Sequence, residues 1–509
     1  MKFPLVLFLT VAAASLPARA ETAPKKPNIV FILSDDHSLQ TIGAYGERLS
    51  EFCKQNNITP NIDKLAEKGG LFVNSFCGNS ICSPSRAAIF TGLHGHANGV
   101  MSIIGQPAIP KEMWSYPVGL REAGYQTFLL GKWHLEKTTP TFDEWIILPG
   151  QGKYFNPDFH SSKGEKMQTK GYVTDVITDL ALEWLNKRDS SKPFFLAIHH
   201  KAPHRPWEPS PNYAAWLDDV KIPEPETLFD DYSTRASPAR EQKMSIAEDM
   251  KMDSDVKVGE KIAKNPNYAA RNADFAKQKP EGRELTQWKY QQYMKDYLRC
   301  VKSVDDSVGR IVEELKKLGL EDNTIVIYSS DQGFFNGEHG WFDKRWIYDE
   351  SIHMPFIVRW PGVVKPGTRF APFIQNIDYA PTFVDMAGGK VPDGLHGHSL
   401  VPVMRGKTPD DWRKSVYYHY YGEKSHQVAK HYGARTDRYT LAFFYDKNEW
   451  ELYDNQKDPL QLHNVYADPA YAKTVEELKA ELTRLRALYK DSDAIVPANQ
   501  RKQANPGAE

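Results

Sequence analysis

Short apolar runs bounded by polar segments are the most regular feature of the chain. The clearest of them cover residues 27–33, 71–76, 126–130, 194–199, 324–328 and 355–360. Continuous apolar runs of this length are typical of strands that a parallel sheet buries on both faces. Apolar side chains at helical spacing over residues 297–315 predict a long helix, which Gly319 is expected to end. The pattern therefore predicts an α/β protein.

The pattern changes near residue 415. Three short runs at residues 416–420, 440–445 and 449–453 predict a small antiparallel sheet. An amphipathic helix is expected to follow, with its apolar face formed by Val475, Leu478, Leu482 and Leu485. We therefore divide the chain into an N-terminal catalytic domain at 21–410 and a C-terminal subdomain at 411–490. The polar residues 491–509 are expected to form a loose tail.

Residues 221–290 interrupt the large domain. They are polar, mixed in charge and poor in apolar periodicity, apart from one stretch at 245–252 that resembles a helix. We interpret this segment as a surface insertion that shapes the rim of a pocket.

The first 20 residues have the features of a secretory signal peptide. Lys2 precedes an apolar run over residues 3–14, and Ala18-Arg19-Ala20 forms a small-x-small cleavage site. The run is too short to span a bilayer, and no later segment approaches a membrane span. No cysteine directly follows the cleavage site, so no lipid anchor is expected. The pattern predicts a periplasmic or secreted protein.

Bulk composition argues against nucleic-acid binding and against a fold that depends on disulfides. The 509 residues are 41% apolar, and the formal net charge is −1. This balance gives no basic field for nucleic acid, so any anion must be recognised by a local cluster of cations. Four cysteines are too few for a disulfide scaffold, so the fold must be stabilised by its apolar core.

Acidic and amide side chains follow two of the predicted strands. Asp35 and Asp36 come directly after residues 27–33, and Asp331 and Gln332 follow residues 324–328. Open α/β sheets place their active sites at such strand ends. Adjacent buried carboxylates repel each other unless a cation lies between them. Because these four residues offer only oxygen ligands, Ca²⁺ is expected in preference to Zn²⁺.

A second group of residues carries chemistry near other strand ends. Lys132 and His134 are two positions apart, so they share a face if the strand continues that far. The segment 199–205 holds three histidines and two cations, which is unusual for a solvated surface. Cys82 begins Cys-Ser-Pro-Ser-Arg, and Pro84 with Ser85 predicts a helix start beside it, where backbone N–H groups favour an anion. A buried structural role is the ordinary alternative for a single cysteine.

Five motifs occur in the order in which type I sulfatases carry them, over residues 27–489. They are the Asp35-Asp36 pair, CSPSR at 82–86 followed by a small-apolar run and Thr-Gly, GKWH at 131–134, His204, and DQG…GEHG…K from Asp331 to Lys344. The chain therefore resembles the formylglycine-dependent sulfatases, and its flanking sequences resemble most the N-acetylglucosamine-6-sulfatase branch that desulfates mucins and glycosaminoglycans. The resemblance implies an alkaline-phosphatase-like α/β fold: a large mixed sheet between helices, with a small C-terminal antiparallel sheet domain and one helix.

The resemblance also implies a modified residue and a metal. Cys82 would be converted to formylglycine (3-oxoalanine) by a formylglycine-generating or anaerobic sulfatase-maturating enzyme. One Ca²⁺ would be held by residue 82 together with Asp35, Asp36, Asp331 and Gln332. Gln332 departs from the family's usual asparagine; it keeps an amide oxygen but has a longer arm. If Cys82 is modified, three cysteines remain, and at most one disulfide can form among Cys53, Cys77 and Cys300.

The resemblance assigns roles to the remaining residues of the motifs. The hydrated aldehyde would be the nucleophile, held by Arg86. The other roles are sulfate binding by Lys132 and Lys344, protonation of the departing sugar oxygen by His204, acceptance of the nucleophile's proton by Asp331, and regeneration of the aldehyde by His134. An ordinary serine or cysteine would be trapped as a stable ester because it lacks the second hydroxyl.

The expected substrate is a sulfated carbohydrate, namely the 6-O-sulfate of a terminal N-acetylglucosamine attacked from the chain end. Aromatic, imidazole and guanidinium groups of the C-terminal subdomain suit contacts with a sugar. The candidates are His419, His426, His431 and Arg435, unless these side chains merely pack the small sheet. Alternative functions are a sulfatase for galactose or galactosamine sulfate, a formylglycine-dependent phosphonate or phosphate ester hydrolase, and a non-catalytic sugar-binding relative.

Overall fold

The computed structural model describes Met1, residues 26–423 and residues 425–492. A ten-stranded mixed sheet forms the centre of the molecule. Its strands, from one edge to the other, are β13 (Thr368–Phe370), β2 (Gly70–Phe72), β12 (Phe356–Arg359), β9 (Thr324–Ser330), β1 (Asn28–Ser34), β8 (Phe194–His199), β4 (Gln126–Lys132), β5 (Glu144–Leu148), β6 (Asp158–Ser161) and β7 (Lys166–Gln168). The five strands from β9 to β5 run parallel, and β12, β6 and β7 introduce antiparallel pairs. The predicted α/β fold and mixed sheet are confirmed.

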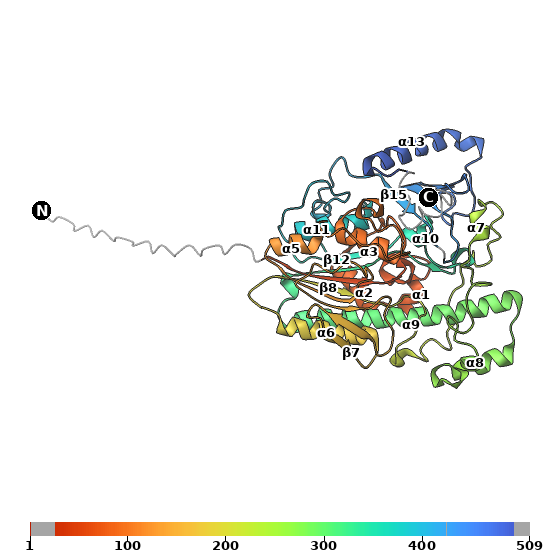
Figure 1. Cartoon of the computed structure of the whole chain (residues 1–509), viewed down its shortest axis with the longest axis horizontal. Helices are drawn as coiled ribbons and strands as arrows, with labels where there is room; N and C mark the ends of the chain where they lie inside the picture. The colour runs from red at the N-terminus through yellow and green to blue at the C-terminus, as the bar shows by residue number, and fades with distance from the viewer. Residues whose placement is uncertain (2–25, 424, 493–509) are drawn as a thin grey trace, which may run out of the picture.

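Helices cover both faces of this sheet (Figure 1). One face carries α3 (Cys82–Thr91), α5 (Tyr116–Glu122) and α11 (Tyr379–Met386), and the other carries α2 (Pro60–Lys68), α6 (Val173–Lys187) and α9 (Gly282–Lys317). Successive side chains of a strand point to opposite faces. Phe31 therefore packs into the first apolar core and Ile32 into the second. This burial on both sides is the reason why β1 reads as an uninterrupted apolar run.

Strand register brings the functional segments to one edge of the sheet. Leu33 of β1 and Gly131 of β4 both pair with His199 of β8, while Ser34 pairs with Ser330 of β9. Because the four strands are parallel and end level with one another, the residues that follow them emerge side by side.

A separate four-stranded antiparallel sheet lies in the C-terminal part. Its strands are β15 (Ser415–Tyr420), β16 (His431–Thr436), β17 (Tyr439–Phe444) and β18 (Glu449–Asp454), and α13 (Ala472–Tyr489) packs on it. The four apolar residues predicted for the helix face are buried against the sheet. The sequence pattern missed β16, because Gly433 and Arg435 interrupt its apolar character.

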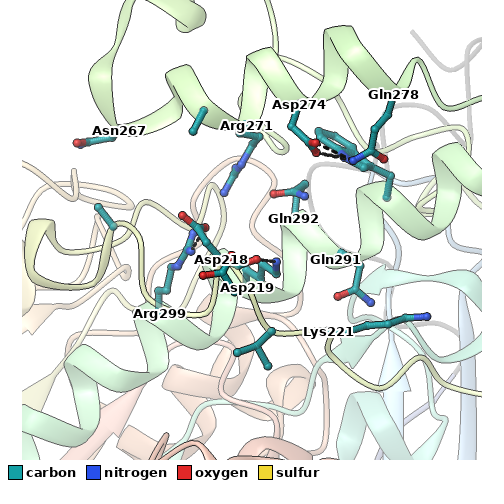
Figure 2. Close-up of a pocket in the computed structure, with 15 residues that line it drawn as sticks. Asp218, Asp219, Lys221, Asn267, Arg271, Asp274, Gln278, Gln291, Gln292 and Arg299 are labelled. Carbon is teal, nitrogen blue, oxygen red and sulfur yellow. Dashed lines mark hydrogen bonds and ion pairs between the residues drawn. The ribbon is translucent and has the colours of Figure 1, made fainter.

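The segment 221–290 is only partly a surface insertion, which corrects the prediction. Met244, Ile246 and Met250 are buried in a main core, and the stretch at 245–252 forms turns where a helix was expected. The insertion does contain the helix α8 (Pro266–Gln278), and α9 begins earlier than predicted, at Gly282. A cavity of about 630 Å³ lies between α8, α9 and residues 214–221 (Figure 2).

Smaller elements complete the described chain. The remaining helices are α1 (Ser50–Gln55), α4 (Gly95–Asn98), α7 (Pro238–Glu241), α10 (Asp349–Ile352) and α12 (Val401–Met404). Two-stranded sheets pair β3 (Ser75–Phe76) with β14 (Ile374–Gln375) and β10 (Phe335–Asn336) with β11 (Phe342–Asp343). None of the helices in residues 26–423 and 425–492 combines the length and apolar character that a bilayer crossing requires.

Several sequence predictions concern the ends of the chain and the cysteines. Apart from Met1, the predicted signal peptide lies outside the described residues, as does the predicted tail from residue 493 onward. Asp491 is an exception to the loose tail, because it is buried and bonded to His419 and Tyr417. All four cysteines are buried and free of disulfide bonds.

Candidate active site

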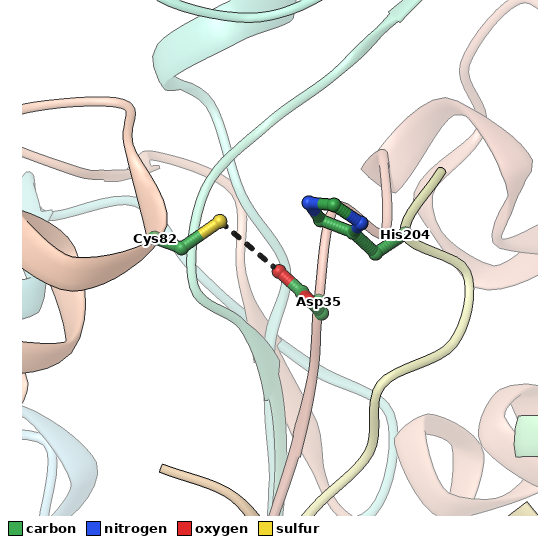
Figure 3. Close-up of side chains that lie close together, drawn as sticks. All are labelled: Asp35, Cys82 and His204. Carbon is green, nitrogen blue, oxygen red and sulfur yellow. Dashed lines mark hydrogen bonds between the residues drawn. The ribbon is translucent and has the colours of Figure 1, made fainter. Parts of the chain in front are cut away.

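Cys82 occupies the first turn of α3, beneath the edge where the parallel strands end. Ile81 is the N-cap residue and provides no side-chain hydrogen bond to the first turn of the helix. Pro84 suits the first turn, because it has no N–H to leave unpaired. The Cys82 thiol points at Asp35, to which it donates at 3.4 Å, and the His204 imidazole lies on the other side of that carboxylate (Figure 3). Cys82 itself is 3% exposed.

Three carboxylates converge on this turn. Asp35, Asp36 and Asp331 form a cluster in which one ligand oxygen from each lies within 4.8 Å of the others. All three are at most 1% exposed. Asp36 has a positive φ of 67°, a backbone conformation that costs free energy for a non-glycine residue and that is common at functional sites. We call these three residues the acidic cluster.

Three cations surround the acidic cluster and the thiol. Lys344 Nζ donates to both oxygens of Asp36 at 2.5 and 2.6 Å, and Lys132 Nζ contacts Asp35. Arg86 donates from Nε to Asp331 at 2.9 Å, and its Nη1 holds the carbonyl of Lys132 at 2.7 Å. These cations are buried with the carboxylates, so their charges interact strongly across a region that excludes water.

The donor set fits a hard cation. The acidic cluster supplies carboxylate oxygens, and Gln332 lies beside it with its Nε2 in contact with Asp36. The Gln332 Oε1 atom is buried and has no hydrogen-bond partner in the described structure. Half a turn of the amide exchanges oxygen and nitrogen and directs Oε1 toward the carboxylates. Oxygen ligands of this kind suit Ca²⁺ or Mg²⁺.

Electrostatics make an unmodified Cys82 a poor nucleophile. Burial raises the pKa of its thiol to about 12, and the neighbouring Asp35 carboxylate adds to the increase. A thiol of this pKa is protonated at neutral pH, whereas the thiolate is the reactive form. Burial would also raise the pKa of Asp35, but the charges of Lys132, Arg86 and Lys344 together hold that pKa well below its usual range. The carboxylate next to residue 82 is therefore ionised.

Two imidazoles lie near the mouth of the site. The His204 side chain is 16% exposed, and its Nε2 lies 3.8 Å from an oxygen of Asp36. His134 follows β4 with a positive φ of 57°, and its carbonyl accepts a hydrogen bond from Ser83. Burial, and then the charge of Lys132, lower the pKa of His134 to about 2 and that of His204 well below its usual value. Both rings are neutral at pH 7 in this arrangement.

The loop that carries His204 is fixed by bonds on both sides. The Tyr154 hydroxyl donates to the carbonyl of His204 at 2.5 Å. Arg205 forms a bidentate pair with Asp255, with both bonds at 2.6 Å. Lys257 donates to the carbonyl of Trp207 at 3.0 Å. His204 is therefore held in place before any ligand binds.

The four candidate sugar-contacting residues divide into two groups. His426 lies near the site, because its Nε2 is 3.3 Å from Asp343, the residue before Lys344. The other three have partners elsewhere: His419 bonds to Asp491, His431 to the backbone of Ile347 and Ala429, and Arg435 forms a bidentate pair with Asp349. Of these four candidates, the structure therefore places only His426 near the candidate catalytic residues.

Sequence reasoning missed residues that the structure places around the site. Asp343 and Arg345 flank Lys344, both with a positive φ, and Arg345 contacts both Asp343 and Glu423. Lys201 and Tyr154 lie against each other beside the His204 loop, with the Lys201 Nζ 4.9 Å from the centre of the Tyr154 ring. The position of Lys201 two residues after a buried strand was the available signal. His199 and His200 have structural partners, the Lys132 carbonyl and Ser307.

Comparisons with known proteins agree with this geometry. The family model described as "Sulfatase" matches residues 27–389, and the model "N-sulphoglucosamine sulphohydrolase, C-terminal" matches residues 337–488. The chain belongs to the sulfatase family. Sulfatases generally use a formylglycine and a divalent metal, and this sulfatase has a cysteine and an oxygen-rich cluster side by side to supply them.

Individual relatives indicate which branch of the sulfatase family the chain resembles most. The sulfatase is 42% identical to an N-acetylglucosamine-6-O-sulfatase of Bacteroides thetaiotaomicron, over 96% of this chain and 92% of that protein. It is 27% identical to the human N-acetylglucosamine-6-sulfatase, over 82% of this chain and 72% of the human one. A solved structure of a protein in complex with its substrate, D-glucosamine-2-N,6-O-disulfate, superposes with a TM-score of 0.87 at 42% identity, covering 92% of this chain and 99% of that one. The predicted resemblance and fold are confirmed.

A solved phosphonate hydrolase resembles this chain in its fold alone. A phosphonate monoester hydrolase of Agrobacterium radiobacter superposes with a TM-score of 0.66 at 22% identity, over 91% of this chain and 96% of that one. At this identity the likeness carries no information on the reaction.

Proposed function

We propose that this sulfatase removes the 6-O-sulfate from terminal N-acetylglucosamine units of mucin-type or glycosaminoglycan glycans. The observation that carries the proposal is the 42% identity to the N-acetylglucosamine-6-O-sulfatase over nearly the whole chain, together with the cations and imidazoles gathered around Cys82. The centre is buried, which suits a primary sulfate that projects from its ring at the end of a glycan.

We propose further that residue 82 is formylglycine in the active protein and that one Ca²⁺ binds at the acidic cluster. A formylglycine hydrate at residue 82 would supply the nucleophile, and a bound divalent metal would lower the pKa of that hydrate and neutralise sulfate charge. Asp35, Asp36, Asp331 and Gln332 would hold the metal. A formylglycine-generating or anaerobic sulfatase-maturating enzyme is the implied partner, and the signal-like N-terminus supports a periplasmic or secreted location.

The remaining residues can act on a bound ester as follows. Lys132 and Lys344 lie beside residue 82 and can bind the sulfate oxygens, and Arg86 is near enough to interact with residue 82 and would help to hold the hydrate. His204 faces the mouth of the site and can hold a proton for the departing sugar oxygen. Burial and Lys132 keep this imidazole neutral without a ligand, and the negative charge of a bound sulfate favours its protonation.

The neighbourhood of Lys344 is the proposed sugar-recognition side. Asp343 and Arg345 present a carboxylate and a guanidinium next to Lys344, and His426 adds an imidazole. These groups can donate and accept hydrogen bonds to sugar hydroxyls. We place the sugar here because His426 brings a group from the C-terminal part of the chain to Asp343, the residue before Lys344.

A substrate panel tests the proposed function. Purified protein is assayed with N-acetylglucosamine-6-sulfate, galactose-6-sulfate, galactose-3-sulfate, N-acetylgalactosamine-6-sulfate and a 2-O-sulfated uronic acid. The first ester is expected to have the highest kcat/KM. Faster hydrolysis of a galactose or galactosamine ester would overturn the branch assignment, and release of phosphate but no sulfate from aryl esters would overturn the sulfatase assignment. Elemental analysis that finds stoichiometric zinc, with activity unaffected by calcium removal, would refute the calcium site.

A further inference from the structure

Lys201 is a buried cation that the mechanism above does not use. It lies two residues beyond the end of β8, and only 2% of its surface is exposed. Its Nζ has no hydrogen bond and no ion pair among the described residues, and its one specific contact is with the face of the Tyr154 ring, 4.9 Å from the ring centre. A buried ammonium without an anion costs several kcal/mol of solvation free energy, on the order of that for any unpaired buried ion.

The other buried lysines of the described chain all have oxygen partners. These partners are Asp35 for Lys132, Asp36 for Lys344, three backbone carbonyls for Lys257, and the carbonyls of Ala247 and Asp218 for Lys289 and Lys295. Lys201 is the exception among them. A cation–π contact with tyrosine contributes about 0.5–2 kcal/mol, which is less than the solvation that burial removes. The charges of Asp35 and Glu208 act on Lys201, but neither carboxylate forms an ion pair with it among the described residues, so its Nζ can take an anion from outside the chain.

Strand register places Lys201 at the reaction centre. His199 of β8 pairs with Leu33 on one side and with Gly131 on the other, so Lys201 emerges between Asp35 and Trp133. Burial, and then the charge of Lys132, lower the pKa of Lys201 to about 8, while Asp35, Glu208 and residue 82 act to raise it. These interactions require Lys201 to lie near those groups, as the strand register also indicates.

A rigid unit joins Lys201 to the catalytic loop. The backbone N–H of His204 donates to the Lys201 carbonyl at 3.0 Å, and the Tyr154 hydroxyl donates to the His204 carbonyl at 2.5 Å. The same tyrosine therefore contacts the Lys201 ammonium with its ring and the backbone of the His204 loop with its hydroxyl. The backbone of Lys201 is therefore fixed relative to the His204 loop, and its ammonium rests on the Tyr154 ring.

We propose that Lys201 binds the sulfate group that is cleaved, as a third lysine beside Lys132 and Lys344. The first two lysines are already shared with carboxylates, whereas the Lys201 ammonium is unpaired until the substrate brings its own anion. The inference deepens the proposed function and rests on it for the substrate. Its main test does not depend on turnover.

The test begins with thermal unfolding of the full chain with sodium sulfate, against sodium chloride at equal ionic strength. Sulfate is expected to raise the Tm of the wild-type protein, because an anion that binds only the folded state stabilises it. In Lys201→Met this sulfate-specific increase should be lost, while the Tm without sulfate should be unchanged or higher, since an unpaired buried charge has been removed. Lys201→Arg should recover part of the sulfate effect. Lys289→Met, at a buried lysine bonded to Ala247, is the matched control and should keep it.

Kinetic measurements then test whether the anion that Lys201 binds is the sulfate that is cleaved. Lys201→Met should raise KM about tenfold to a hundredfold, as expected for loss of a charged hydrogen bond. The factor should be the same for N-acetylglucosamine-6-sulfate and for D-glucosamine-2-N,6-O-disulfate. A rise confined to the disulfate would overturn the proposal in favour of contact with the second sulfate. An unchanged sulfate effect on Tm, or a lower Tm without sulfate, would assign Lys201 a structural role. If the wild-type protein cleaves neither ester, the proposed function fails, and the sulfate effect on Tm still decides the role of Lys201.

Discussion

The substitution Asp296→Asn tests how far the loop around His204 depends on one buried carboxylate. Asp296 lies on α9 with no exposed surface, and three cations surround it. Arg271 of α8 forms a bidentate pair with it at 2.7 and 2.8 Å, Arg299 donates at 3.1 Å, and Lys257 lies 3.4 Å away. Lys257 in turn bonds the carbonyl of Trp207, close to His204 in sequence.

The magnitude follows from the pKa of Asp296 and from its burial. Burial would raise this pKa, but Arg271 and Lys257 lower it to about 2, against an ordinary value of 3.8. At 1.36 kcal/mol per pKa unit, the ionised form gains about 2.4 kcal/mol in the folded state. Loss of one partner from a buried ion cluster typically costs about 3–5 kcal/mol, because the remaining charges stay buried and unpaired. We expect Asp296→Asn to destabilise the protein by about 2–5 kcal/mol at pH 7.

Because folding lowers the pKa of Asp296, the stabilisation from its carboxylate should be lost at low pH. The stabilisation is complete above the unfolded pKa of about 3.9 and is lost as the pH falls through about 2, so the wild-type and variant proteins should converge in stability below pH 4. Scanning calorimetry gives the difference in Tm at pH 7, 5 and 3.5, and amide hydrogen exchange reports opening of residues 255–299. Asp322→Asn, at an exposed carboxylate, is the control. An unchanged Tm together with unchanged exchange at Lys257 and α8 would refute the reasoning.

Three further predictions concern the reaction centre directly. Cys82→Ala should abolish sulfate release, and the mass of the peptide around residue 82 in active wild-type protein should be that of formylglycine; an unmodified thiol in fully active enzyme would contradict this. Gln332→Leu should weaken metal binding by about tenfold or more, because one oxygen ligand is removed from a buried site, and calorimetric titration of the metal-free protein measures it. His204→Gln should reduce hydrolysis of the sugar ester about 10²- to 10⁴-fold but that of an activated aryl sulfate much less, because a good leaving group needs no proton. Equal losses on both esters would argue against His204 as the proton donor.

Much of the fold and of the reaction centre could be predicted from local sequence. The strand before Asp35 is apolar on both faces because helices cover both faces of the sheet. Its burial can therefore be predicted from the apolar character of its own residues. The same holds for the strand before Asp331. Since parallel strands end at a common edge, strand-end acids and the Cys82 turn can be expected to meet before any coordinates are known.

Only the tertiary structure decided which charged groups are available to a ligand. Arg435 and His419 have the composition of a sugar site, yet their partners Asp349 and Asp491 lie 86 and 72 positions away along the chain. Lys201 shows the opposite case: the sequence marks residues 199–205 as unusual for a solvated surface, but only the fold shows that Lys201 is buried against Tyr154 without an ion pair. Hydrophobic periodicity reports burial along one element. The pairing of charges depends on distances between elements, which the sequence pattern does not contain.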